Sequence, residues 1–570
     1  MQDDIFKKRI WFGIFGILFL VVIFIIRLFY LQVIKADHFE QEADKQYVSS
    51  ASKVFDRGTI FFTDKNGNAI SAASLKSGFR VVINTKIIKD PLDLYQKIGP
   101  FLGMEKEAFL KLASKKNNSY VELTTTLDDV NASEISAQKI SGVTVSRNKW
   151  RFYPAQNLAS NVIGFMGYKG DEFAGRYGIE RYYDKVLARN DKRLYVNFFA
   201  EIFSDMNQFL TNKDEIEGDV VTTLESSVQQ NLETTLNTIQ EKWNSDRVGG
   251  IIMNPKTGEI LAMGLDHLFN SNETKNVTDV SRFNNPLVES NFEMGSIMKP
   301  IIMAIALDQN AVTPTMTYFD QGFVKVADRT IYNFDKKGRG LASMQTVLNQ
   351  SLNTGMVFVM QHMKKEAFKN QWLSFGFGQK TGIDLPAEGS GLISNLNTNR
   401  DVEYANVSFG QGVAVTPIMM TRALAVLANG GQLVTPHVVQ RVEYPSGFTR
   451  ELDWTPSVTS IIKPETVQTI TDMLVTVFDN YNDGKTKLEH YTIAAKTGTA
   501  QIANGSGGYY ADRNLHTFMA YFPAKNPQFI VFLYNQYPKN GARFSSETLI
   551  PPFTDLAKFL INYYDVPPDR

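Results

Sequence analysis

The sequence predicts a multidomain α/β (α+β) protein with a single N-terminal transmembrane helix, an elongated α+β module, and a C-terminal domain in which helices cover a central antiparallel sheet. Three observations predict this class. A long uncharged apolar run lies near the N-terminus. Strand-like and polar helical segments then alternate up to about residue 218. Beyond that point strands come first, helices rich in Met, Leu and Ala follow, and strands return. A chain of 570 residues also exceeds one typical core, so two or three domains are expected.

The N-terminal apolar run is long enough for a membrane helix. From Ile10 to Ile26 the chain carries no charge, and the apolar character resumes beyond Arg27. Roughly 20 apolar residues cross a bilayer, and the three basic residues before the run favour a cytoplasmic N-terminus. We therefore predict a cytoplasmic tail over 1–9 and an uncleaved anchor over 10–33. A cleaved signal peptide is the alternative, but the bulky side chains after Arg27 do not resemble a small-residue cleavage site.

Residues 34–218 are predicted to form a non-catalytic α+β module. The strand-like runs TIFFTD, FRVVINT and GVTVSRN alternate with polar helical stretches, and Asn, Asp and Lys are frequent between them. No cluster of catalytic residue types stands out in this region of the sequence.

Residues 219–570 have the pattern of a domain built around one sheet. DVVTTL predicts a strand, SSVQQNLETTLNTIQEKW predicts an amphipathic helix opened by a Ser cap, and VGGIIMNPKTGEILAMGL predicts two strands joined by a turn. Helical segments follow, including SIMKPIIMAIALDQ and TPIMMTRALAVLANG. The strands YTIAAKTGTAQ, HTFMAYFPA and FIVFLYNQ come next, before a last helix, PPFTDLAKFLINYY. Because strands lie at both ends, we expect one sheet closed by both ends of the domain and covered by helices.

Composition excludes several classes of function. The 59 basic and 59 acidic residues balance, which argues against a nucleic-acid binder. The chain has no cysteine, so disulfides, thiolate metal sites and cysteine nucleophiles are excluded. The 6 histidines show no pair at helical metal-ligand spacing, and we expect neither a metal nor a cofactor. Any chemistry must come from Ser, Thr, Lys, Asp, Glu or Tyr.

Ser296 and Lys299 in FEMGSIMKP are the first candidate catalytic pair. Three residues apart on a helix, their side chains would share one face, within hydrogen-bond reach. Serine needs an adjacent base, and lysine serves as one when desolvation or a neighbouring cation lowers its pKa. The alternative is that Ser296 only caps a helix. Ser-x-x-Lys also occurs elsewhere in the chain, so the spacing alone is weak evidence.

A second cation is predicted at Lys496, in the strand-like run TIAAKTGTAQ. The tripeptide Lys-Thr-Gly also begins at Lys256 and Lys380, where a turn and a loop favour a structural role. In the third copy Gly498 would allow a close approach of another backbone. An edge strand there could pair with an extended peptide, while Lys496 meets an anionic group and the hydroxyls of Thr497 and Thr499 donate.

Ser351 and Asn353 lie between these motifs in NQSLNTGM, where they alternate as side chains of a short loop would. A helix cap is again the alternative. Taken together with the other two motifs, however, Ser351 and Asn353 would supply what the first motif lacks: a serine that shuttles protons and an amide that holds a lysine.

The order Ser-x-x-Lys, Ser-x-Asn, Lys-Thr-Gly is the motif set of penicillin-binding proteins and serine β-lactamases. RGTIFFTDKNG, RFYP, VIGFMG and GRYGIE are similar to signatures of the class B pedestal, and VSFGQGVAVTP, KTGTAQ and PAKNP continue the match. The chain thus resembles the monofunctional class B penicillin-binding proteins over nearly its whole length. Among them it most resembles the division-type transpeptidases often called penicillin-binding protein 3.

The resemblance implies a peptidoglycan D,D-transpeptidase that is also the covalent target of β-lactams. Ser296 would attack the penultimate D-Ala carbonyl and Lys299 would take the hydroxyl proton. Ser351 and Asn353 would relay protons and position the donor peptide. Further residues are implied to bind the carboxylate or to form the oxyanion hole. Lys496 and Thr497 are implied to bind the carboxylate, and Gly498 and Thr499 to bind substrate beside them. The backbone N–H groups of Ser296 and Thr499 are implied to form the oxyanion hole.

Two rival functions stay open at this stage: a D,D-carboxypeptidase or β-lactamase of the same fold, and a membrane-anchored β-lactam sensor or scaffold. The partners implied by the resemblance are stem peptides ending in D-Ala-D-Ala, β-lactams, membrane lipid, a polytopic glycan polymerase, and other divisome or elongasome proteins. The implied location is the plasma membrane, with the catalytic domain outside it.

Overall fold

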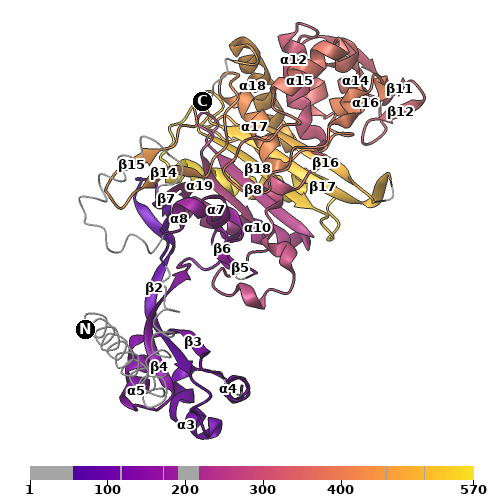
Figure 1. The fold of residues 1–570 in the computed structure, drawn as a ribbon. Helices are drawn as coiled ribbons and strands as arrows, with labels where there is room; N and C mark the ends of the chain where they lie inside the picture. Colours follow the sequence, from indigo (N-terminus) through magenta and orange to yellow (C-terminus); the bar gives the residue numbers. More distant parts are fainter. Residues whose placement is uncertain (1–55, 116–117, 171, 190–216, 456–459, 506) are drawn as a thin grey trace, which may run out of the picture. The chain divides into compact units, whose positions relative to one another are not determined.

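The computed structural model describes residues 56–570 except 116–117, 171, 190–216, 456–459 and 506. These residues form two compact units (Figure 1). The predicted tail and anchor lie outside the described residues. In the described part of the chain, no helix combines the length and the apolar character needed to span a membrane. The predicted domains are continuous segments of the sequence, whereas each of these units is made of several segments. The domain boundaries therefore stay a prediction.

The smaller unit contains residues 75–151. Strand β2 pairs with both β3 and β4, and the helices bury apolar side chains such as Ile98 and Phe109 against Val81 of β2. Helix α3 starts where the Asp90 carboxylate accepts hydrogen bonds from two backbone N–H groups of its first turn. The elements are β2 (Ala69–Ile83), α3 (Pro91–Leu102), α4 (Lys106–Ala113), β3 (Val121–Leu127), α5 (Asp129–Ala137) and β4 (Val143–Phe152).

The larger unit contains residues 57–74, 152–189 and the chain from 217 to 570. Its first sheet joins distant parts of the sequence in the order β15-β14-β7-β1 and the first residues of β2. Strand β7 is the predicted strand DVVTTL, which lies in this sheet and not in the central one. The strands are β1 (Ile60–Thr63), β7 (Asp219–Glu225), β14 (Val439–Glu443) and β15 (Thr449–Glu451).

A buried ion pair joins three of the N-terminal sequence signatures within the larger unit. Arg57 of RGTIFF donates from Nε to Glu180 Oε2 at 2.7 Å, and the Tyr153 hydroxyl of RFYP donates to Glu180 Oε1 at 3.1 Å. All three side chains are buried. A buried charge pair tolerates the loss of neither partner, so these signatures serve to hold segments 57–74 and 152–189 together.

The central sheet of the larger unit is five-stranded and antiparallel, in the order β16-β17-β18-β8-β9. The prediction that strands from both ends of the domain share one sheet is therefore correct: β18 pairs with β8, and β16 forms an edge. The strands are β8 (Arg247–Met253), β9 (Ile260–Leu265), β16 (Ala494–Ala503), β17 (Tyr509–Phe522) and β18 (Phe529–Gln536).

Helices cover both faces of this sheet (Figure 1). Successive side chains of a strand point to opposite faces. In β18, Val531 and Leu533 accordingly pack in the core beneath α10 (Ser226–Trp243) and α19 (Ser545–Tyr563), whereas Ile530 and Phe532 belong to the core beneath α12, α17 and α18. On this second face α17 (Pro417–Ala425) and α18 (Pro464–Asp479) contact the sheet, and α12 (Lys299–Asp308) packs on α18. Further helices pack on these or on one another: α13 (Met344–Asn349), α14 (Asn353–Gln361), α15 (Lys365–Ser374) and α16 (Asp401–Ser408).

Short elements complete the larger unit. They include two small antiparallel strand pairs, β10 with β13 and β11 with β12, which precede α13. The remaining elements are α6 (Ser160–Ile163), β5 (Met166–Lys169), β6 (Glu172–Gly175), α7 (Gly178–Tyr182), α8 (Asp184–Leu187), α11 (Pro286–Glu289), β10 (Thr317–Asp320), β11 (Phe323–Val326), β12 (Arg329–Tyr332) and β13 (Gly340–Ser343).

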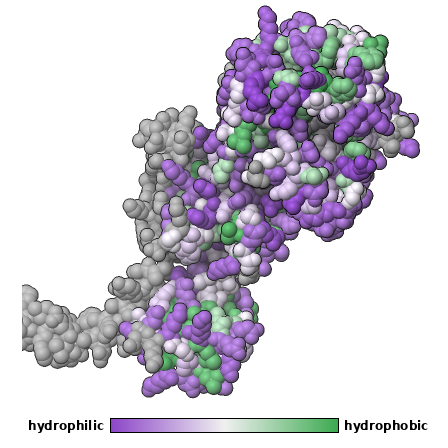
Figure 2. Space-filling view, turned by 90° about the vertical axis from the view of Figure 1, so that its right-hand side faces the viewer, coloured by the Kyte–Doolittle hydropathy of each residue, from purple (hydrophilic) through white to green (hydrophobic). Residues whose placement is uncertain are grey.

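The cap of one helix and the start of another differ from the predictions. Helix α10 begins at Ser226 as expected, but its cap is Glu225, whose carboxylate accepts from Val228 N at 2.6 Å. The last helix begins at Ser545, ahead of the predicted start, and contains Pro551 and Pro552. On the face drawn in Figure 2, hydrophobic side chains lie in small groups among hydrophilic ones, because most apolar side chains are in the cores.

Candidate active site

Ser296 lies in a short 3₁₀ helix, Gly295–Met298, that leads directly into α12. The cap position is held by Met294, not by the serine, so the capping interpretation of Ser296 is wrong. The residues on either side of Ser296 are buried, while Ser296 itself is partly exposed. Among the described residues its hydroxyl has no hydrogen-bond partner. Ser296 therefore presents a partly exposed hydroxyl that no group of the described residues occupies.

Lys299 is the first residue of α12 and is fully buried. Its Nζ donates to Ser351 O at 2.6 Å, to Ser351 Oγ at 3.2 Å and to Asn353 Oδ1 at 2.9 Å. The predicted hydrogen bond to the Ser296 hydroxyl is not among these contacts. Burial, and then the positive charge of Lys496, lower the pKa of Lys299 well below its usual range. Both effects favour the neutral amine, the form that can act as a base.

Ser351 connects the two lysines. It lies between α13 and α14 with φ of 54°, in the left-handed region that a non-glycine residue rarely adopts. Its Oγ accepts from Lys299 Nζ and, at 3.1 Å, from Lys496 Nζ. A hydroxyl has two lone pairs and one proton. With both lysines donating, the Ser351 proton points to neither, so it is available to a bound molecule.

Asn353 is the first residue of α14 and not part of a short loop as predicted. Its carboxamide has a defined orientation: Nδ2 donates to the Tyr332 carbonyl at 3.0 Å, and Oδ1 accepts from Lys299. The Tyr332 carbonyl is a functional group that the sequence could not reveal, because every residue has a carbonyl and only the fold selects one.

Lys496 lies on the edge strand β16, as predicted, and its side chain is buried. Burial lowers its pKa to about 7. Its Nζ donates to Ser351 Oγ and, at 2.9 Å, to the Thr497 carbonyl. The hydroxyl of Thr497 has no hydrogen-bond partner among the described residues, whereas that of Thr499 donates to Ser545 Oγ and accepts from Ser545 N, both at 3.2 Å. Thr499 is therefore tied to the start of α19.

Gly498 allows β16 to pass close to the turn that carries Ser296. A Cβ atom at this position would lie 2.3 Å from Thr517 Oγ1, 3.0 Å from Met294 O and 3.1 Å from Ile297 N. No larger residue fits without moving one of these groups. The glycine thus brings the Lys-Thr-Gly strand against the 3₁₀ helix. The sequence predicted a close approach of another backbone at Gly498, but not which backbone it would be.

Glu293 is a residue near Ser296 that the sequence did not single out. Its Oε1 accepts from Gly412 N at 3.0 Å, and both carboxylate oxygens contact the Tyr509 hydroxyl. Burial raises the pKa of Glu293. The contact joins the segment before Ser296 to the FGQG segment and to β17, and Gly295 N donates to Gly410 O at 3.1 Å beside it.

The site combines a partly exposed serine, a buried lysine whose pKa is lowered, a bridging serine and a second buried lysine. Such a set activates a hydroxyl for attack on a carbonyl, and the cation of Lys496 can meet an anionic group. In the described part of the chain, no group of three or more His, Asp or Glu side chains could hold a metal ion. The arrangement is suited to acyl transfer through a serine hydroxyl, with a buried lysine at hand as a base.

Comparison with known proteins identifies the family. Residues 248–553 match the penicillin binding protein transpeptidase domain, and residues 53–223 match the penicillin-binding protein dimerisation domain. The chain is 30% identical to stage V sporulation protein D of Bacillus subtilis over 96% of this chain and 84% of that protein. It is 28% identical to a peptidoglycan D,D-transpeptidase FtsI homolog of Mesostigma viride, over 95% of this chain and 93% of that protein.

A solved structure has the same fold: penicillin-binding protein 3 of Mycobacterium tuberculosis in complex with aztreonam. It superposes with a TM-score of 0.68 at 23% identity, covering 91% of this chain and 98% of that one. The chain belongs to the penicillin-binding protein family and carries its transpeptidase domain. The resemblance to the class B members, and the prediction of a serine transpeptidase of cell-wall synthesis, are confirmed.

Proposed function

We propose that this chain cross-links peptidoglycan stem peptides as a D,D-transpeptidase with Ser296 as its nucleophile. One observation carries the proposal: the partly exposed Ser296 hydroxyl lies in the 3₁₀ helix that leads directly into α12, where Lys299 is fully buried and its pKa is lowered. Family membership and relatives named as peptidoglycan D,D-transpeptidases support the choice of substrate.

Acylation would start at the Ser296 oxygen. Lys299, in its neutral form, takes the hydroxyl proton while Oγ forms a bond to the carbonyl carbon of the penultimate D-Ala. The backbone N–H groups of Ser296 and Thr499 would stabilise the oxyanion, an effect worth about 3 kcal/mol in comparable sites. The C–N bond then breaks, and the terminal D-Ala leaves with a proton supplied through Ser351, which accepts from both lysines.

Substrate binding would use the edge strand β16. Lys496, in its protonated form, and the unoccupied Thr497 hydroxyl meet the terminal carboxylate of the donor peptide. Asn353 would hold the donor through its carboxamide. The amine of a neighbouring stem peptide then attacks the acyl-enzyme, forming the cross-link and returning the Ser296 hydroxyl. A β-lactam would acylate Ser296 by the same step, with the leaving nitrogen still tethered.

Labelling with a fluorescent penicillin tests the nucleophile. The solubilised full chain is expected to carry the label on a peptide that contains Ser296, and Ser296→Ala should abolish it. Ser460→Ala is a matched control, because Ser460 begins another Ser-x-x-Lys sequence, and its labelling should equal that of the unaltered chain. Label that persists in Ser296→Ala would refute the assignment.

Product analysis with a D-Ala-D-Ala donor separates transfer from hydrolysis. A D-amino acid acceptor should give the exchanged peptide in addition to released D-Ala. If only the hydrolysis product formed at every acceptor concentration, the enzyme would be a carboxypeptidase.

We also propose that residues 10–33 anchor the chain in the plasma membrane, with residues 1–9 in the cytoplasm and the catalytic domain outside. The uncharged run Ile10–Ile26 and the basic residues before it support this topology. A polytopic glycan polymerase and other divisome or elongasome proteins would then be its membrane neighbours. Protease added to intact spheroplasts should digest the catalytic domain, and site-specific cross-linking from the anchor should capture the polymerase. A protected catalytic domain would contradict the topology.

A further inference from the structure

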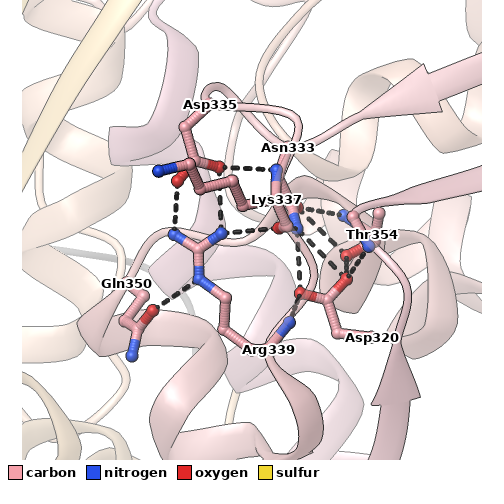
Figure 3. Close-up of polar contacts among 8 residues, drawn as sticks. Asp320, Asn333, Asp335, Lys337, Arg339, Gln350 and Thr354 are labelled. Atoms are coloured by element: carbon pink, nitrogen blue, oxygen red, sulfur yellow. Dashed lines mark hydrogen bonds and ion pairs between the residues drawn. The ribbon is translucent and has the colours of Figure 1, made fainter.

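A buried polar cluster lies beside the start of α14, outside the catalytic groups described above. Its centre is Asp320, at the end of β10, and Asn333, directly after β12. Their exposed fractions are 2% and 1%. Figure 3 shows Asp320 in contact with Asn333, with Thr354 of α14 and with Arg339. A buried carboxylate with this many contacts is costly unless every contact is made.

The Asp320 carboxylate fixes the orientation of the Asn333 amide. Asp320 accepts from Gly322 N at 2.9 Å, from Arg339 N at 3.1 Å and from the Thr354 hydroxyl at 2.8 Å. Asn333 Nδ2 donates to Asp320 Oδ2 at 2.9 Å. An ionised carboxylate only accepts, so the NH₂ group of Asn333 must face it. The Oδ1 atom of Asn333 is consequently left to face Thr354 of α14.

The segment Tyr332–Asn333 holds the first two residues of α14. The cap residue of this helix, Leu352, has no side chain that could accept a hydrogen bond. Instead Asn333 Oδ1 accepts from Thr354 N at 3.2 Å, and it thereby satisfies one N–H group that the helix start leaves open. The neighbouring Tyr332 carbonyl accepts from Asn353 Nδ2. Because a carbonyl only accepts, it turns the Asn353 Oδ1 atom toward Lys299.

Arg339 extends the cluster toward Ser351. Its backbone N–H donates to Asp320, and its Nε donates to Gln350 Oε1 at 2.8 Å. Two further donors hold Asp335 at 2.9 Å each, in a bidentate pair (Figure 3). Gln350 immediately precedes Ser351, the residue in the left-handed conformation. The cluster therefore contacts both sides of the segment that carries Ser351 and Asn353.

We propose that Asp320 and Asn333 are positioning residues for acyl transfer, which act by orienting the Asn353 carboxamide toward Lys299 and by fixing the start of α14 beside Ser351. The inference rests on the proposed function, because it assigns these residues to the same reaction. Neither side chain touches the reacting atoms. Their effect comes from geometry, since a displacement of about 1 Å at a catalytic group can cost on the order of a hundredfold in rate.

Asp320→Asn is the sharpest single change, because it keeps the shape and replaces one acceptor oxygen by a donor NH₂ group. That NH₂ group must face an N–H or O–H donor, so the amide of Asn333 loses its fixed orientation. The rate constant for acylation by fluorescent penicillin, divided by the concentration of protein whose Ser296 can be labelled, should fall on the order of a hundredfold. Asp328→Asn, the same substitution at an exposed position between β11 and β12, should leave the rate unchanged.

A double-mutant cycle separates positioning from general damage to the fold. If Asp320 acts through Asn353, Asp320→Asn should have little further effect in a chain that already carries Asn353→Ala. Losses that multiply, or an unchanged rate in Asp320→Asn, would overturn the proposal. If Asp320→Asn does not fold, Thr354→Val removes one donor to Asp320 without a change of size, and the same cycle with Asn353→Ala applies. If the unaltered chain were not labelled at Ser296 at all, that result would instead contradict the proposed function itself.

Discussion

Of the three Lys-Thr-Gly segments in the larger unit, those that begin at Lys380 and Lys496 have surroundings that give them opposite properties. In the segment from Lys380 to Gly382, the lysine is exposed, and the donors of the other two residues are occupied. Thr381 N and Thr381 Oγ1 donate to Glu388 Oε1 at 2.5 and 2.6 Å, and Gly382 N donates to Glu388 Oε2 at 3.2 Å. This copy binds a carboxylate of its own chain.

In the segment from Lys496 to Gly498 the lysine is buried and the threonine hydroxyl has no partner among the described residues. The strand lies at the edge of the central sheet, beside Ser296. The first copy thus has its donors occupied by an internal carboxylate, whereas in the second the Thr497 hydroxyl is left unoccupied and, under the proposed function, meets the carboxylate of a ligand. Function follows from which donors the rest of the chain leaves unoccupied.

The largest difference between the two copies is expected for the lysines. Lys496→Ala should lower the rate of acylation by penicillin by roughly a hundredfold to a thousandfold, because it removes the cation that meets the ligand carboxylate and that lowers the pKa of Lys299. Lys380→Ala should not change the rate, since that side chain is exposed. Stopped-flow acylation of the two variants side by side measures the difference. Equal losses in both would show that the comparison is wrong.

A smaller effect is expected on stability, and it depends on pH. Lys496 has a pKa of about 7 in the folded chain against 10.5 in the unfolded chain. Below pH 7 both states are protonated, and the burial of the charge opposes folding in full. Between pH 7 and 10.5 only the unfolded state holds the proton, so this penalty declines as the pH rises. Lys496→Met should therefore stabilise the larger unit by about 2 kcal/mol at pH 6 and by progressively less toward pH 10.

Thermal midpoints at pH 6 and pH 10 check this expectation, with Lys380→Met as the control for the loss of a lysine at an exposed place. The control should show no dependence on pH beyond that of the unaltered chain. A gain from Lys496→Met that is the same at both pH values would mean that lysine burial is not its cause.

The sequence predicted those features of the fold and the site that depend on the periodicity of apolar residues and on the order of the motifs. Strands β8, β9 and β16 to β18 and helix α10 were predicted because their apolar residues recur with the period of each element. It could not be predicted that the Thr381 hydroxyl has a hydrogen-bond partner and that the Thr497 hydroxyl has none among the described residues, because Glu388 accepts from Thr381 only after the loop has folded. For the same reason the role of the Tyr332 carbonyl, the left-handed conformation of Ser351 and the hydrogen bonds between Thr499 and Ser545 could not be predicted from the sequence.

The smallest expected effect, and the one that separates the two copies most cleanly, concerns their threonines. Thr497→Val and Thr381→Val remove a hydroxyl at nearly constant volume. Thr497→Val should lower the acylation rate about tenfold, the value of one hydrogen bond to a charged group, and leave the thermal midpoint unchanged. Thr381→Val should do the reverse: it leaves the Glu388 carboxylate and the Ile383 N–H, which donates to Thr381 Oγ1, each short of a partner. It should therefore destabilise the unit by about 1 to 2 kcal/mol without a change in rate. If either variant altered both quantities, the internal and the ligand-facing carboxylate sites would not be independent.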